Sequence, residues 1–312
     1  MVKTCIVLFV ITLIARPIVA GEVLPSLQPN LINHFTFDNP ENGDPKSIVE
    51  LDLGSDKVNI NLLNGAPRVP DGAWSGSKYS LETGQKNTKP NDDWKAGVMF
   101  QSSADSKLHG SQNVAGVTIM GWFKPLAGPE GNPSINTNQP NSTTRYNAFG
   151  LAGLLRGDEG VGKLDGHVVR ALLEVIGGKV TAMGRRLDNQ SASGQLPSVD
   201  SWDVVMPPNK WTHLAASIDF ANGKMALYKN GQPLATGALN VRSWLSTGDS
   251  RTSNTAAGGI KIGGSHPNNQ TEQNPFNGRI DELMFFNKAL SAEEVASQYK
   301  LISDPNPAGM TR

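Results

Sequence analysis

Cysteine is almost absent from this chain of 312 residues, which contains only Cys5. Cys5 lies in an N-terminal apolar run with the pattern of a removable secretory leader, so we expect no internal disulfide, zinc-thiolate site or iron–sulfur cluster after processing. Small exported domains often depend on disulfides, but a chain of this length buries enough apolar surface to fold without them. The sequence therefore excludes thiol chemistry from the processed protein.

A second long apolar run is also absent, and the first is short. Residues 1–20 carry a basic Lys3, an apolar stretch and a predicted cleavage point after Ala20. A cut a few residues away is the alternative, because Ile18 is larger than the small residue preferred at the third position before the cut. A transmembrane anchor is the alternative, but a bilayer span needs roughly 20 mostly apolar residues, whereas Arg16 and Pro17 close this run early. We expect a secreted or extracytoplasmic protein with no membrane span once the leader is removed.

Charge of one sign is not in excess, because 28 Lys and Arg balance 28 Asp and Glu. Without a basic run interleaved with aromatic residues, nucleic acid is not an expected partner. The five histidines are widely spaced and form no H-x-H or H-E-x-x-H pattern, so zinc has little support. The 33 Gly and 20 Pro separate strand-like runs, which is typical of an all-β protein.

Tight turns and short strands are marked clearly in the C-terminal third. Asn222-Gly223 and Asn230-Gly231 tolerate positive φ and bracket residues 224–229, whose alternation predicts a half-buried strand. Glycine pairs flank residues 260–262, a short strand whose two isoleucines share one face.

A helix start is equally clear near the C-terminus. Ser291 is a predicted N-cap, and Glu294 completes a capping box. Leu290 and Val295 have the spacing of a hydrophobic staple around it. The sequence predicts a short C-terminal helix that begins after Ser291.

An ordered set of residues connects these segments: Trp211, His213, Leu214, Ala215, Tyr228, Asn230, Gly231, Ile262, Gly263, Gly264, Phe276, Gly278, Ile280, Asp281, Glu282, Ala289, Leu290, Ser291, Glu294 and Val295. In this order they resemble the C-terminal half of a laminin-G-like jelly roll in the concanavalin A-like lectin and glucanase superfamily. Looser similarity continues upstream through residues 34–38, 97–100 and 117–125. The resemblance implies an all-β fold, a two-sheet antiparallel jelly-roll sandwich with a short C-terminal helix.

The expected organisation has one domain. We assign 1–20 to the leader, 21–30 to an N-terminal linker, 31–302 to the laminin-G-like domain and 303–312 to a C-terminal tail. Residues 145–208 depart most from the resemblance, with two apparent insertions.

Calcium is the one cofactor that the resemblance suggests. It implies that some relatives hold calcium with an acidic residue of the last strand and oxygens near the first strand, and the matching residues here are Asp281 and Asp38. Hard oxygen ligands suit this ion, although six or more are needed. Alternatively, Asp38 caps a turn through Asn39-Pro40.

Ligand specificity is expected in the long polar loops, which cluster around a jelly roll. Trp202 and Trp244 lie in two of these loops, and each offers a flat face on which a sugar ring can stack. The alternative is that each tryptophan plugs its own loop onto the sandwich. Three N-x-[ST] sequons, at Asn141, Asn189 and Asn269, also fall in predicted loops.

Enzyme motifs of the superfamily are incomplete. Glu50 and Asp52 are similar to the first two acids of the glucanase E-[IL]-D core, but Gly54 stands where its second glutamate belongs. Residues 95–101 resemble one alginate-lyase stretch whose partner motifs are missing. The sequence favours an exported, non-catalytic module that binds glycans or extracellular proteins; the alternatives are a divergent glycan-active enzyme, either a glycoside hydrolase or a polysaccharide lyase, and a purely structural surface protein.

Overall fold

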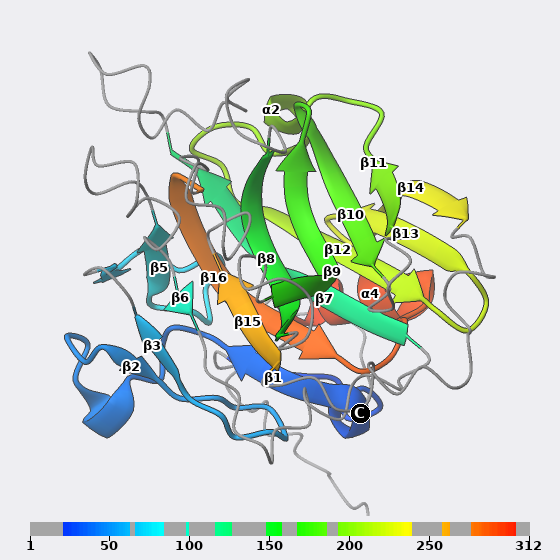
Figure 1. Ribbon diagram of the computed structural model, residues 1–312. Helices are drawn as coiled ribbons and strands as arrows, with labels where there is room; N and C mark the ends of the chain where they lie inside the picture. Colours follow the sequence, from blue (N-terminus) through cyan, green and yellow to red (C-terminus); the bar gives the residue numbers. More distant parts are fainter. Residues whose placement is uncertain are drawn as a thin grey trace, which may run out of the picture.

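The computed structural model describes residues 21–62, 66–83, 98–99, 116–126, 148–157, 167–185, 193–238, 258–262 and 276–303. Within these ranges the chain forms two antiparallel sheets of eight strands each. Figure 1 shows β8, β9 and β10 of one sheet in front of β7 and β12 of the other, with helix α4 behind them. No helix in these ranges has the length and apolarity needed to cross a membrane. The all-β sandwich with a short C-terminal helix is confirmed.

The strand order places β7 and β16 at the centre of the first sheet, which we call sheet A. Sheet A has the order β14 (Gln232–Ala238), β13 (Lys224–Lys229), β12 (Thr212–Asp219), β7 (Gly116–Pro125), β16 (Gly278–Phe286), β5 (Ser80–Thr83) and β4 (Arg68–Val69), with β1 (Leu31–Phe35) paired to β16. Sheet B has the order β11 (Ser193–Pro197), β10 (Lys179–Arg185), β9 (His167–Ile176), β8 (Ala148–Gly157), β15 (Gly258–Ile262), β6 (Val98–Met99), β3 (Ile60–Leu62) and β2 (Val49–Glu50). The described helices are α2 (Trp202–Val205), α4 (Ala292–Leu301) and two short 3-10 turns, η1 (Gln28–Asn30) and η2 (Glu41–Gly43).

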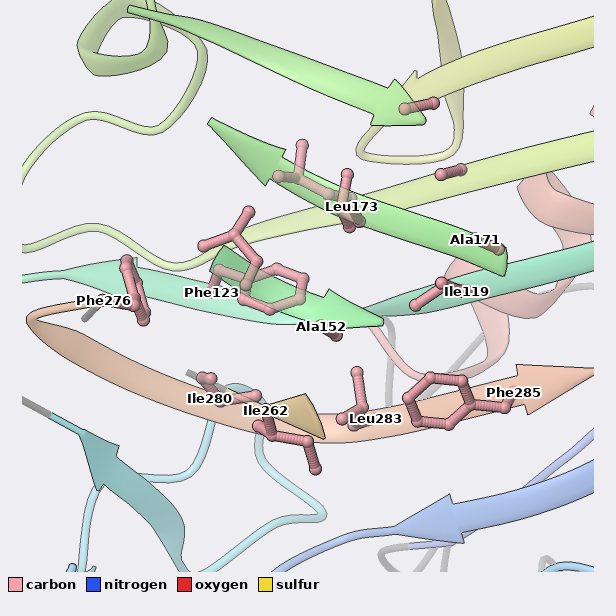
Figure 2. Close-up of a cluster of buried hydrophobic side chains, with 14 of the residues drawn as sticks. Ile119, Phe123, Ala152, Ala171, Leu173, Ile262, Phe276, Ile280, Leu283 and Phe285 are labelled. Atoms are coloured by element: carbon pink, nitrogen blue, oxygen red, sulfur yellow. The ribbon is translucent and has the colours of Figure 1, made fainter. Parts of the chain in front are cut away.

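The main core lies between the two sheets. Along β12, Leu214, Ala216 and Ile218 point into this core, while Ala215 points to the other side of sheet A. This alternation follows from the period of two in a strand. Figure 2 shows this core with side chains from both sheets, among them Phe123 of β7 and Leu173 of β9.

The outer face of sheet A is also covered. A second apolar cluster joins Trp122 and Tyr228 of the sheet to Val295 of α4 and to Val23 and Leu27 of the N-terminal segment. Residues 21–30, which we expected to be a linker, therefore pack against the domain. Sheet A is consequently apolar on both faces, unlike a sheet that faces water on one side.

The local elements follow the turn and cap chemistry of the sequence. Asn230 and Gly231 have φ of 49° and 73° and join β13 to β14 in a two-residue loop. Paired positive φ values are typical of the type I′ hairpin turn, which matches the twist of the strands. At α4 the Ser291 hydroxyl accepts from the Glu294 N–H, and the Glu294 carboxylate accepts from the Ser291 N–H. The predicted hairpin and capping box are both confirmed.

A bulge interrupts β16 where it pairs with β7. Asp281 lies opposite Trp122 and Met284 opposite Met120, so two residues of β16 face Gly121 alone. Glu282 adopts a positive φ of 47°, an uncommon conformation for a residue with a side chain. The bulge places Asp281 and Glu282 next to each other at the outer face of sheet A.

Candidate functional site

The bulge creates a buried polar cluster that we call the acid corner, made of His34, Asp38, Trp74, Asp281 and Glu282. The Glu282 carboxylate is fully buried and has three described partners. Its Oε2 lies 2.7 Å from Nε2 of His34, which is also fully buried. Its Oε1 accepts from the Trp74 indole at 3.2 Å and from the Gly21 backbone N–H at 3.1 Å. Segments far apart in sequence thus meet at this carboxylate.

Asp281 is equally buried and is held by donors of the loop between β4 and β5. Its Oδ2 accepts from the Ala73 N–H and from the Ser77 hydroxyl, each at 2.8 Å, and its Oδ1 accepts from the Glu282 N–H at 2.8 Å. Burial first, and then the neighbouring charges of Glu282 and Asp38, raise the pKa of Asp281 well above its usual range. The hydrogen bonds oppose this shift without cancelling it.

Asp38 belongs to the same neighbourhood but lies at its half-exposed rim. Its carboxylate accepts from the N–H groups of Lys78 at 3.0 Å and Tyr79 at 2.8 Å. Burial raises the pKa of Asp38, and the charge of Glu282 adds to the shift. Asp38 therefore caps the start of β5.

The donor set around these two carboxylates does not fit calcium. A calcium site is lined by six or more oxygens, whereas the groups facing Asp38 and Asp281 are N–H and O–H donors. In the described part of the chain, no group of three or more His, Cys, Asp and Glu is arranged to hold a metal ion. We derive no role for calcium from this corner.

The two tryptophans proposed for sugar stacking have different outcomes. Trp202 begins α2 and is only 6% exposed, with its ring edge-on to Phe149 at a centroid distance of 5.5 Å. This position matches the alternative in which the tryptophan plugs its own loop onto the core. Trp244 lies outside the described residues, as do the sequons at Asn141, Asn189 and Asn269.

The carboxylates that resemble a glucanase motif support the fold. Glu50 accepts from Nε and Nη2 of the buried Arg68, at 2.9 and 2.6 Å. Asp52 accepts from the His34 and Gly54 N–H groups, at 2.9 and 2.8 Å. Burial raises the pKa of both acids. Their partners hold the chain between β1 and β3 and leave neither acid open to a substrate.

An open groove lies elsewhere, between α4 and the outer face of β12, β13 and β14. We call it the α4 groove, and its volume is about 960 Å³. Its floor is formed by small side chains from adjacent strands, because Ala226 pairs with both Ser217 and Thr236. Residues 288–294 form the wall that leads into α4.

Charged and hydroxyl groups surround this floor. Lys224 and Asp219 lie opposite each other on β13 and β12 at one end. Lys288 is 43% exposed on the wall and pairs with Glu294. The groove thus offers cations, carboxylates and hydroxyls over a shallow apolar surface. Sequence reasoning missed this groove, because the pairing of Ser217, Ala226 and Thr236 across three strands is set by the fold.

The comparisons with known proteins agree on the fold. Residues 177–296 match the family model described as the concanavalin A-like lectin/glucanases superfamily. A search of curated proteins found no match.

Solved structures with the same fold include bacterial toxin domains. The binding domain of Paraclostridial mosquitocidal protein 1 is 14% identical, with a TM-score of 0.53 over 88% of this chain and 52% of that chain. The binding domain of botulinum neurotoxin DC in complex with SialylT is 10% identical, with a TM-score of 0.54 over 89% and 52%. The same domain in complex with rat synaptotagmin II is 11% identical, with a TM-score of 0.55 over 89% and 52%.

This chain spans about half the length of those toxin structures, and identities this low speak for the fold alone. The match over residues 177–296 includes the hairpin strands, the bulged strand and the start of α4. Residues 177–296 are therefore similar to the concanavalin A-like lectin/glucanases superfamily, and the described residues have the two-sheet antiparallel sandwich fold.

Proposed function

We propose that this protein is an exported, non-catalytic module that binds a glycan or an extracellular protein. The observation that carries the proposal is the α4 groove, whose volume of about 960 Å³ lies near the upper end of the range for ligand sites, about 300–1,000 Å³. The leader predicted over residues 1–20 supports export. The solved neighbours are binding domains, and two of them were solved with a sialylated ligand or a synaptotagmin.

The lining of the groove suits a saccharide first. Sugars present hydroxyls on the edge of a ring and C–H groups on its faces, so they need polar groups around a flat apolar surface. Ala226 and Thr236 supply that surface, and Lys224, Asp219 and Lys288 supply donors and acceptors at its edges. Lysines that reach carboxylate groups would favour an acidic sugar.

A groove-filling variant tests the proposal. Thr236 is exposed on the groove floor, so Thr236→Tyr places a ring where the ligand would lie. We expect a glycan array that includes sialylated oligosaccharides and gangliosides to detect binding by the natural chain, and the variant to lose at least about tenfold in affinity, or about 1.4 kcal/mol.

Gln232→Tyr is the matched control, because Gln232 is exposed on the same strand outside the groove. Equal loss in both variants would mean that the strand was disturbed. Binding that survives Thr236→Tyr unchanged would remove the groove from the proposal and direct attention to the loops. Release of reducing ends or unsaturated sugars from polysaccharides would replace it with the enzymatic alternative.

A further inference from the structure

The N-terminal segment is attached to the domain by buried polar side chains. The Leu24 N–H donates to the Gln298 side chain at 3.0 Å, and the Gln298 amide donates to the Glu22 carbonyl at 3.0 Å. The Gly21 N–H donates to Glu282 at 3.1 Å. Since Gln298 and Glu282 are both fully buried, the segment has a fixed position up to its first described residue.

That first described residue is also the one that follows the predicted cleavage point. Hydrolysis of the Ala20–Gly21 bond by a signal peptidase consumes one water and leaves Ala20 as a carboxylate and Gly21 as an α-ammonium group. The Gly21 nitrogen then changes from an amide with one N–H into a cation with three N–H donors. It lies within hydrogen-bond distance of Glu282 Oε1 in the structure.

The charges around Glu282 favour such a cation. Three carboxylates, those of Asp38, Asp281 and Glu282, interact electrostatically in this corner, and His34 contacts Glu282 through Oε2. A buried carboxylate costs several kcal/mol unless it is paired and hydrogen-bonded. An ammonium group on Oε1 would supply that pairing on the side that His34 does not cover.

The space around Gly21 also has a specific shape. A Cβ added at Gly21 would lie 2.7 Å from the Leu53 Cδ1 atom, closer than real Cβ contacts. Gly21 also has a φ of 90°, a conformation that glycine adopts readily and other residues rarely do, so glycine suits this position.

We propose that Glu282 is the receptor for the α-ammonium group of Gly21, so that removal of the leader completes an ion pair inside the domain. The proposal rests on the export that the proposed function includes, but not on the identity of any ligand. It gives the glutamate of the bulge a role that is distinct from metal binding and from the α4 groove.

Two purified chains with defined N-termini test this ion pair. One begins at Gly21, and the other keeps Ala20, which preserves the Gly21 N–H but moves the ammonium group one residue away. We expect the chain that begins at Gly21 to melt about 3 °C higher at pH 7. In Glu282→Gln versions of both chains the difference should fall below about 1 °C, whereas Glu41→Gln, at an exposed glutamate, should leave it unchanged.

A second readout covers the case in which Glu282→Gln does not fold. The α-amine of the chain that begins at Gly21 should react at least about tenfold more slowly with an acylating reagent than the α-amine of the chain that keeps Ala20, because a paired ammonium group is a poor nucleophile. Equal melting temperatures together with equal reactivity would overturn the ion pair. An exported protein whose first residue, read by mass spectrometry, is not Gly21 would overturn the assignment while leaving the binding function open.

Discussion

His213 is a buried histidine, and within the described residues no hydrogen-bond partner stabilises a charge on its ring. Its ring packs against Trp122 at 5.4 Å and Tyr299 at 5.3 Å, and within the described residues neither ring nitrogen has a hydrogen-bond partner. Burial lowers the pKa of His213 to about 3. The residue therefore packs in the cluster under α4 as a neutral ring.

This depressed pKa makes stability depend on pH in a defined direction. Because the unfolded chain takes up a proton near pH 6.5 and the folded chain only near 3, His213 lowers the free energy of unfolding as pH falls through that window. We expect His213→Phe to gain about 2 kcal/mol relative to the natural chain between pH 7 and pH 5, measured by urea unfolding at both values. A difference that does not change with pH would contradict the assignment.

At the scale of elements, α4 connects the domain's outer face to its N-terminal segment. Val295 and Leu301 are buried, and Gln298 holds residues 22–24. The capping box at Ser291 fixes where this helix begins, and so where its apolar face meets sheet A. The position at which α4 begins therefore affects both the wall of the α4 groove and the contacts of residues 22–24.

Removal of the cap should loosen α4 locally. Ser291→Ala leaves the Glu294 N–H without its partner and should cost about 1 kcal/mol. Hydrogen exchange should speed up in the first turn of α4 and in residues 22–24. Ser297→Ala, in the same helix but away from its start, serves as the control and should show neither effect. Unchanged exchange in Ser291→Ala would mean that packing alone positions the helix.

The elements with strong local signals were predictable, and the site was not. Asn230-Gly231 and Ser291 act through their immediate neighbours, so the sequence alone places the hairpin and the helix start. The partners of Glu282 come from positions 208 and 248 residues away, and no local pattern connects them. Trp202 shows the same limit, because a loop position does not decide whether a ring faces the core.

On the scale of the whole molecule, sheet A is covered on both faces, by sheet B on one side and by α4 with residues 21–30 on the other. The acid corner lies where the N-terminal segment, the β4–β5 loop and β16 meet. Hydrogen bonds between these distant segments hold the acid corner together.

Addition of calcium should therefore not change the stability of the folded protein. We expect 2 to 5 mM calcium, on the order of the weakest extracellular sites, to change the melting temperature by less than about 1 °C. Magnesium at the same concentration is the control for ionic strength. A melting temperature that rises with calcium but not with magnesium, and no longer rises in Asp38→Asn, would show that Asp38 takes part in a calcium site. That result would contradict the interpretation that hydrogen bonds alone satisfy Asp38 and Asp281.

The bulge in β16 changes which side of sheet A each later residue of the strand faces. Ile280 and Leu283 both face the main core, although strict alternation would place them on opposite sides. One added residue, Glu282, reverses the facing of every later position in the strand, so that Met284 and Phe286 lie outside and Phe285 inside. Deletion of Glu282 would therefore restore strict alternation with Leu283 and Phe285 still inside and Met284 and Phe286 still outside, and it would remove the carboxylate that Gly21, His34 and Trp74 contact.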